Sequence, residues 1–199
     1  DFVNDVVATP DGATMRRQYL LHPGAVGVIA LDDADRIAVV RQYRHPVGYQ
    51  LVEPPAGLLD GDGETWLTAA KRELAEEVQL RAERWQVLVD LFTTPGANQE
   101  SLRIYLATGL SPEPAPADFA AEHEEADMEV CWAARADVVD AVLAGRLQNP
   151  TMVSGVLALE VARLSGRLDQ LRDAASDWPA RTAWAAHNSS LAGRDGHSG

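Results

Sequence analysis

A short segment of the sequence concentrates carboxylates at helical spacing. Residues 71–77 read KRELAEE, so that Glu73 lies three and four positions before Glu76 and Glu77. On a helix these positions are neighbours on one face, and like charges at this spacing destabilise the helix by roughly 0.2–0.5 kcal/mol per pair. A bound cation would offset the repulsion, and Mg²⁺ prefers carboxylate oxygens as ligands. The segment therefore predicts a site for a hard divalent metal ion.

The residues around this segment could orient the site. Arg72 lies four positions before Glu76, where an i,i+4 ion pair would fix the acidic face. Upstream, the glycines within residues 57–63 permit tight turns, which would let a backbone carbonyl approach a cation bound by the helix. The metal ligands that we expect are the carbonyl of Ala56 and the carboxylates of Glu73, Glu76 and Glu77.

Residues 57–80, GLLDGDGETWLTAAKRELAEEVQL, resemble the Nudix box. That pattern is Gly, a short spacer, Glu, seven residues, and then Arg-Glu-apolar-any-Glu-Glu-any-Gly-apolar. The matching positions are Gly57, Glu64, Arg72, Glu73, Leu74, Glu76, Glu77 and Leu80. The first spacer is one residue longer than the usual five, as it also is in the ADP-ribose branch of the family. Gln79 stands where the pattern has Gly, and we expect it to alter the end of the helix more than the chemistry.

Segments outside the box are similar to the ADP-ribose pyrophosphatases of this family. These segments are residues 41–60, 90–110, 122–132 and 146–150, with WPARTAWAA at 178–186. The resemblance implies the Nudix fold, which is an α+β fold with a mixed β-sheet sandwiched between α-helices. It also implies hydrolysis of ADP-ribose to AMP and ribose 5-phosphate with Mg²⁺ or Mn²⁺, by a homodimer whose N-terminal strands exchange between subunits.

The resemblance further implies a general base in the acidic loop AEHEEADME, residues 121–129. Alignment of this loop points to Glu125 as the base or as a ligand of a third metal ion, with Glu124 as the alternative. Within the box, Glu76 is the next candidate for the base. Arg72 is expected to support the catalytic carboxylates.

Three charged residues resemble substrate contacts. Arg44 matches the arginine that faces the diphosphate, and Glu100 matches a carboxylate that meets the terminal ribose hydroxyls, while Glu53 is a weaker candidate. Val52 stands where the relatives have Trp, and PGFSDE of the relatives is PGANQE at 95–100. Another nucleoside diphosphate, such as NADH, a GDP-sugar or a flavin dinucleotide, therefore stays open as the substrate. A ligand-sensing protein without turnover is a further alternative, against which the retained acidic cluster argues.

Patterns along the chain predict the elements that position these residues. We expect two hairpin-joined strands within 14–31 and 36–43, further strands at 49–54, 85–95, 101–110 and 129–134, and helices at 66–78, 136–147 and 151–164. Residues 112–128 are too polar and proline-rich for either regular element. We expect a single domain over residues 1–175 and a C-terminal tail over 176–199.

Composition narrows the classes of partner. The chain has 199 residues, with 30 acidic against 17 basic side chains and a net charge of −13, so it would repel nucleic acids and anionic membranes. The family resemblance, and not the composition, implies a small nucleoside diphosphate sugar as the partner. The chain contains no long apolar run, and residues 1–30 lack a signal-peptide pattern, so a cytoplasmic location is expected. The single cysteine, Cys131, is expected to be a small core residue.

Overall fold

The computed structural model describes residues 1–61, 63–116 and 128–183. The helices and strands are β1 (Phe2–Ala8), β2 (Thr14–Leu20), β3 (Ala25–Ala30), β4 (Arg36–Arg44), η1 (His45–Val47), β5 (Tyr49–Glu53), β6 (Ala56–Leu58), α1 (Trp66–Val78), β7 (Leu80–Phe92), β8 (Ser101–Pro112), β9 (Glu129–Ala134), α2 (Arg135–Leu143), α3 (Pro150–Leu164), η3 (Leu168–Gln170) and β10 (Arg172–Asp173). None of the helices in these described ranges has the length and apolar character to cross a membrane.

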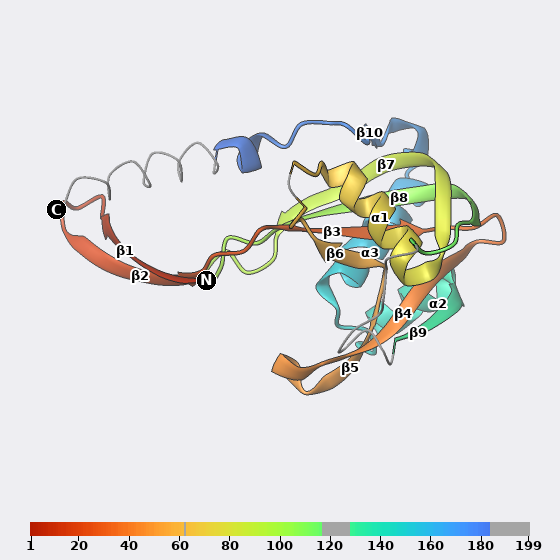
Figure 1. The fold of residues 1–199 in the computed structure, drawn as a ribbon, viewed down its shortest axis with the longest axis horizontal. Helices are drawn as coiled ribbons and strands as arrows, with labels where there is room; N and C mark the ends of the chain where they lie inside the picture. Colours follow the sequence, from red (N-terminus) through yellow and green to blue (C-terminus); the bar gives the residue numbers. More distant parts are fainter. Residues whose placement is uncertain (62, 117–127, 184–199) are drawn as a thin grey trace.

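A mixed β-sheet lies at the centre of the fold (Figure 1). Of the described strands, five form this sheet in the order β10-β7-β8-β3-β6, with β3 parallel to β8 and the other neighbours antiparallel. Three others form a second sheet in the order β5-β4-β9. This mixture of sheet and helices confirms the predicted α+β class.

Helices α1 and α3 cover opposite faces of the central sheet. Val26 and Val28 of β3 pack in one core cluster with Leu74 of α1, whereas Ile29 packs in a second cluster with Met152 of α3. Successive side chains of a strand point to opposite faces, so β3 contributes to both cores. The sheet is therefore sandwiched between helices, as the sequence predicted.

The sequence explains where helix α1 begins and where it ends. Thr65 is the N-cap, and its hydroxyl accepts a hydrogen bond from the backbone N–H of Thr68 at 3.2 Å. The helix ends at Val78, and Gln79 adopts the left-handed conformation, with φ 55° and ψ 44°. Glycine is the residue that adopts this conformation most readily. The departure from the Nudix pattern thus falls on the residue that terminates the helix.

The expected hairpin between residues 14–31 and 36–43 is wrong. β3 and β4 are consecutive, but they belong to different sheets, and only an isolated bridge between Leu31 and Ile37 links the two segments. The turn at 32–35 is present, with the Asp32 carboxylate accepting hydrogen bonds from two backbone N–H groups. It carries the chain from one sheet to the other, and the turn residues alone do not reveal such a switch.

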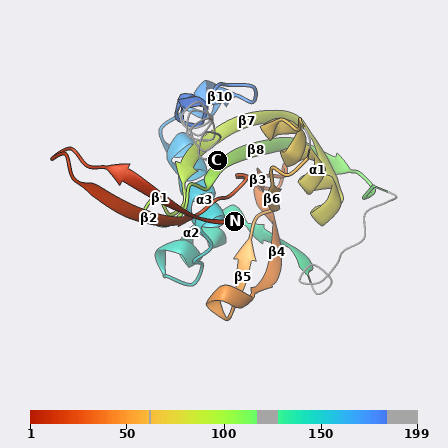
Figure 2. The ribbon, with the colours of Figure 1, turned by 60° about the vertical axis from the view of Figure 1, so that its left-hand side comes forward.

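The N-terminal residues form a hairpin of their own. β1 pairs antiparallel with β2 from Phe2 opposite Leu20 to Ala8 opposite Thr14. The sequence analysis assigned no strand to residues 2–8, so the partner of β2 within the same chain is a finding of the structure. Figures 1 and 2 both show the β1–β2 hairpin projecting away from the sheets.

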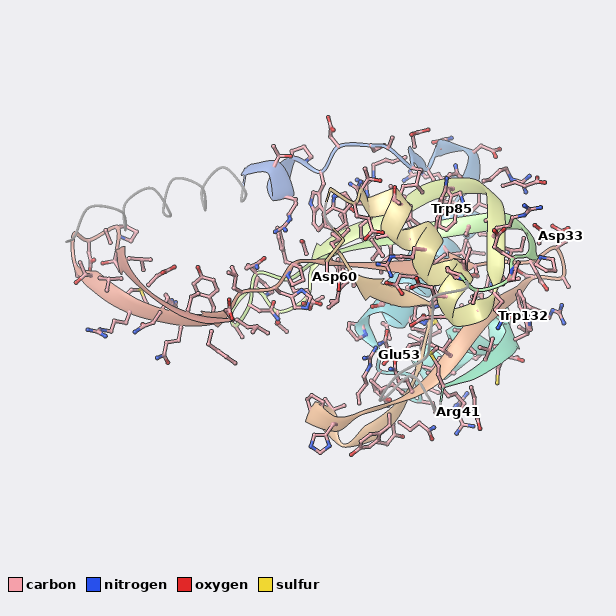
Figure 3. All side chains as sticks on the ribbon, in the orientation of Figure 1. Asp33, Arg41, Glu53, Asp60, Trp85 and Trp132 are labelled. Carbon is pink, nitrogen blue, oxygen red and sulfur yellow. The ribbon has the colours of Figure 1, made fainter. Side chains whose placement is uncertain are left out.

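Parts of the chain from residue 172 onward contact the central sheet and helix α1. β10 pairs with β7, and Trp178 packs on Trp66 and Phe92 with ring centroids 5.4 and 5.5 Å apart. Cys131 is exposed, which corrects the expectation of a core cysteine. The reason is that β9 is an edge strand of its sheet, where the neighbouring Trp132 (Figure 3) is exposed as well.

Candidate active site

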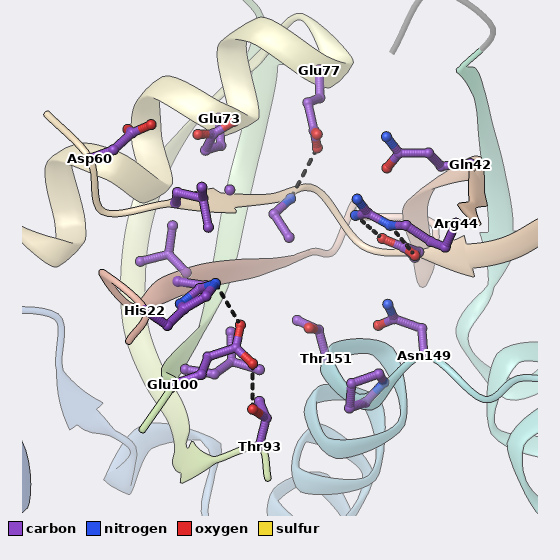
Figure 4. A pocket seen from close by; sticks show the side chains of 18 of the residues that line it. His22, Gln42, Arg44, Asp60, Glu73, Glu77, Thr93, Glu100, Asn149 and Thr151 are labelled. Atoms are coloured by element: carbon purple, nitrogen blue, oxygen red, sulfur yellow. Dashed lines mark hydrogen bonds and ion pairs between the residues drawn. The ribbon is translucent and has the colours of Figure 1, made fainter. Parts of the chain in front are cut away.

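A cavity of about 560 Å³ lies beside the acidic face of α1 (Figure 4). Its walls also include residues of β3 to β6, the start of β8 and the N-terminus of α3. The predicted site residues that line it are Arg44, Glu53, Ala56, Arg72, Glu73, Glu76, Glu77 and Glu100. Glu124 and Glu125 lie outside the described residues. The fold thus brings together residues from distant parts of the sequence.

Arg72 holds the acidic face of α1 in a fixed arrangement. Its Nη1 donates to Glu73 Oε1 at 2.6 Å and to Glu76 Oε2 at 2.9 Å, and its Nε donates to Glu64 Oε1 at 3.1 Å. The Glu64 hydrogen bond raises the pKa of Arg72 above its ordinary value, and the charges of Glu73 and Glu76 add to this effect. The expected ion pair between Arg72 and Glu76 is therefore present.

Glu77 contacts the strand opposite α1 through a backbone amide. The N–H of Ala56 donates to Glu77 Oε2 at 3.0 Å. The sequence had pointed to the carbonyl of Ala56 as a metal ligand, whereas the contact seen here is made by its amide. The role of that carbonyl stays a prediction.

Gly57 is required by the close approach of β6 to α1. A Cβ at this position would lie 2.0 Å from Glu73 Oε1, far inside van der Waals contact. Glu73 is only 8% exposed and lines the cavity, so an added Cβ would force its carboxylate to rotate away from its hydrogen bond with Arg72. Gly57 therefore creates the space that the Glu73 carboxylate occupies.

The donor set fits a hard divalent cation, although the side chains are turned to other partners. Within the described ranges, no three His, Cys, Asp or Glu side chains converge on a point that could hold a metal ion. Glu73 and Glu76 face Arg72, and Glu77 faces Ala56. Three carboxylates on one helix face nevertheless line one cavity, and oxygen ligands of this kind suit Mg²⁺ or Mn²⁺. Metal binding by all three requires their side chains to rotate.

Arg44 and Glu53 form a two-bond ion pair across β4 and β5. Arg44 Nε donates to Glu53 Oε1 at 3.0 Å and Nη2 donates to Oε2 at 2.7 Å. Glu53 is 2% exposed, while the Arg44 side chain is 40% exposed. The buried Glu53 carboxylate thus orients the Arg44 guanidinium. The sequence analysis did not predict this ion pair.

Glu100 lies on the opposite side of the cavity from Arg44 in Figure 4. Its Oε1 is 3.5 Å from His22 Nε2, and its Oε2 accepts a hydrogen bond from the Thr93 hydroxyl. Sequence analysis missed His22 and Thr93, because neither belongs to a motif. Thr93 follows β7 and lies opposite Glu100 in the β7–β8 hairpin, where its backbone N–H donates to the Glu100 carbonyl at 3.3 Å. His22 reaches Glu100 through a tertiary contact in which the backbone N–H of Leu20 donates to the carbonyl of Ala97 at 3.0 Å.

Two further residues of the cavity were missed. Gln42 lies two positions before Arg44 on β4, and this spacing alone could have placed it on the same face. Asn149 is the N-cap of α3, a position that asparagine favours. Both side chains are buried polar groups at the cavity wall.

The sequence is similar to those of several curated proteins. An ADP-ribose pyrophosphatase of Mycobacterium tuberculosis is 45% identical over 183 residues, which are 92% of this chain and 86% of that protein. An ADP-ribose pyrophosphatase of Bacillus subtilis is 38% identical over 55% of this chain and 58% of its own length. A methanol dehydrogenase activator of Bacillus methanolicus is 42% identical over 54% of this chain and 57% of its own length.

The fold is also found in a known crystal structure. An ADP compounds hydrolase aligns with a TM-score of 0.68 over 83% of this chain and 87% of that chain, at 22% sequence identity. This likeness supports the fold alone. The family model described as NUDIX domain matches residues 21–153, which include the carboxylate helix and most of the cavity wall. With its box helix, its sandwiched mixed sheet and this match over more than half of its length, the chain belongs to the Nudix family.

Proposed function

We propose that this Nudix protein hydrolyses the pyrophosphate bond of ADP-ribose, giving AMP and ribose 5-phosphate. The observation that carries the proposal is the single cavity that combines the carboxylate face of α1 with Arg44 and Glu100. Such a cavity offers metal ligands, a phosphate contact and an acceptor for sugar hydroxyls together. The 45% identity to a protein named ADP-ribose pyrophosphatase supports the choice of substrate.

The metal ligands in this proposal are Glu73, Glu76 and Glu77, with the carbonyl of Ala56. A bound Mg²⁺ or Mn²⁺ would neutralise charge on the diphosphate and lower the pKa of a bound water. Arg72 keeps two of these carboxylates on the cavity side of α1, through the hydrogen bonds described above.

The substrate contacts in this proposal come from the two ends of the cavity. Arg44, oriented by Glu53, donates N–H bonds to the diphosphate. Glu100, held by Thr93 and His22, accepts hydrogen bonds from the terminal ribose hydroxyls. Glu125 is the proposed general base and Glu124 the alternative.

A homodimer is part of the proposal. Phe2 and Val6 on the projecting β1–β2 hairpin are 86% and 66% exposed, and apolar side chains gathered on a projecting hairpin are typical of an association surface. A second copy of the chain would cover them. The cytoplasmic location stays a prediction from the sequence.

A substrate panel tests the choice of ADP-ribose. We expect kcat/KM for ADP-ribose to exceed that for NADH, a GDP-sugar and FAD by at least about tenfold, since the proposed role of Glu100 is to accept hydrogen bonds from a terminal ribose. The products of each reaction should be identified by chromatography. If kcat/KM is higher for one of the other three compounds, that compound is the preferred substrate and ADP-ribose is not. The proposal of pyrophosphate hydrolysis would still hold.

A further inference from the structure

Gln42 presents a carboxamide to the cavity. The residue is 5% exposed and lines the cavity wall. Its side chain forms no hydrogen bond with any residue in the described ranges. Its amide atoms are not sealed from solvent, so cavity water can complete their hydrogen bonds, and a polar ligand that displaces this water can take over the same bonds.

Asn149 presents a second carboxamide whose orientation is fixed. Its Oδ1 accepts a hydrogen bond from the backbone N–H of Met152 at 2.8 Å, as an N-cap does. The Nδ2 group must then be the end that is turned away from that N–H. Asn149 is 8% exposed and lines the same cavity, so its Nδ2 is available there as a donor.

The cavity has an excess of negative charge, so neutral hydrogen-bond donors are useful for binding an anionic diphosphate. Among the described residues that line it, six carboxylates (Glu53, Asp60, Glu73, Glu76, Glu77 and Glu100) face two arginines, Arg44 and Arg72. Each arginine already forms ion pairs with glutamates of this wall. The positive charge of both arginines is therefore already balanced by glutamates before a diphosphate enters the cavity. Carboxamide N–H groups bind an anion without adding to the charge of either sign.

The position of the two amides indicates which part of the ligand they contact. Figure 4 shows Gln42 and Asn149 on the Arg44 side of the cavity, away from Glu100. Gln42 and Arg44 share one face of β4 because they are two residues apart. Asn149 caps the N-terminus of α3, whose backbone dipole favours negative charge. All three features favour an anionic phosphate group over a base or a sugar.

We infer that Gln42 and Asn149 form an amide clamp, which donates N–H bonds to the diphosphate beside Arg44. The inference deepens the proposed function, on which it rests for the presence of a nucleoside diphosphate. The clamp contributes equally to substrate and transition-state binding, so it acts mainly on KM. It holds the ligand and takes no part in proton transfer.

ADP, with Mg²⁺ present, is the probe for the clamp, because it carries a diphosphate and no terminal ribose. The variants are Gln42→Leu and Asn149→Ser, of which the second retains a good N-cap and loses the amide donor. The control is Gln50→Leu, an exposed glutamine on the neighbouring strand β5. Dissociation constants are measured by calorimetry and unfolding midpoints by circular dichroism.

Each clamp variant should weaken ADP binding about tenfold, as expected for the loss of a hydrogen bond to a charged group. The unfolding midpoint of Asn149→Ser and the ADP affinity of Gln50→Leu should stay at the wild-type values. For ADP-ribose hydrolysis, KM should rise while kcat is retained.

ADP affinities of both clamp variants within about twofold of wild type would overturn the inference, as would the absence of ADP binding by the wild type. A fall in kcat with unchanged KM would also contradict it. Failure of the proposed function gives a different result, namely no AMP from ADP-ribose with the wild type. ADP binding does not depend on that reaction.

Discussion

The carboxylates of α1 are positioned by groups that are not metal ligands. Arg72 contacts Glu73 and Glu76, the amide of Ala56 contacts Glu77, and the absent side chain of Gly57 leaves space for Glu73. A substitution of any of these groups should therefore act through the carboxylate that it positions. Gly57 offers the sharpest test, because it has no side chain that could take part in the chemistry.

Gly57→Ala should lower kcat/KM for ADP-ribose by at least about 100-fold, which is comparable to the loss expected for Glu73→Gln. The added Cβ would lie 2.0 Å from Glu73 Oε1 and must displace that carboxylate. Gly96→Ala is the control, because a Cβ there meets nothing within 4 Å. Steady-state kinetics at saturating Mg²⁺ measure the effect, and near-normal activity of Gly57→Ala would show that the position of Glu73 is not critical.

The proposed base is tested by a pair of adjacent substitutions. Glu125→Gln should lower kcat by about 10²- to 10⁴-fold with ADP-ribose binding retained, because a base that deprotonates water contributes little to ground-state affinity. Glu124→Gln makes the same change of charge one position away and should retain its rate. Equal losses in both variants would mean that the role is shared, and a loss in Glu124→Gln alone would assign the base to Glu124. If neither loses rate, Glu76 is the next candidate.

At the residue scale, the sequence predicted the site residues that lie close together in one segment at a recognisable spacing. Arg72 and the three glutamates of α1 could be predicted because helical spacing places them on one face. Thr93 lies opposite Glu100 in the β7–β8 hairpin, so the pairing of these two strands could have indicated it. His22 could not be predicted, since its contact with Glu100 arises when the segment before β3 packs against the segment before β8. The same holds for the Arg44–Glu53 pair, which depends on the register between β4 and β5.

At the element scale, the end of α1 retains a strained residue. Gln79 has a positive φ of 55°, in a region that costs an ordinary residue about 1 kcal/mol or more. It does not line the cavity. The strain therefore affects the stability of the fold and leaves the chemistry of the site unaffected.

Gln79→Gly should raise the free energy of unfolding by about 0.5–1 kcal/mol, because relief of the strain exceeds the added entropy of glycine in the unfolded chain. Gln79→Ala retains the strain and should give no such gain. Urea unfolding at constant pH measures both variants. A loss of stability in Gln79→Gly would show that the Gln79 side chain makes a stabilising contribution larger than the strain.

The elements themselves were predictable to different degrees. Helix α1 follows from apolar positions at helical spacing, and these residues are indeed buried, as Ala70, Leu74 and Val78 show. The pairing of β3 with β8 instead of β4 could not be predicted, because a turn does not specify which sheet receives the next strand. β6 has only three residues, too short for a periodic signal.

At the scale of the whole molecule, the projecting β1–β2 hairpin should mediate a dimer. Light scattering should return about twice the 21.5 kDa of one chain, and the double variant Phe2→Ser, Val6→Ser should shift the protein toward the monomer, since it removes exposed apolar area. Val161→Ser is the control, because this residue is exposed to 65% on α3. A wild-type mass near 21.5 kDa at working concentration would contradict the dimer.

The central claim is that the α1 carboxylates bind a divalent metal ion used to hydrolyse ADP-ribose. The most direct measurement is the hydrolysis of ADP-ribose by the wild type with Mg²⁺ set against the same reaction with EDTA, with the products separated and identified. We predict AMP and ribose 5-phosphate in equal amounts with Mg²⁺, and a rate lower by at least about 100-fold with EDTA, because the acidic cavity then lacks the charge that neutralises the diphosphate. An equal rate in EDTA, or no AMP under either condition, would contradict the claim.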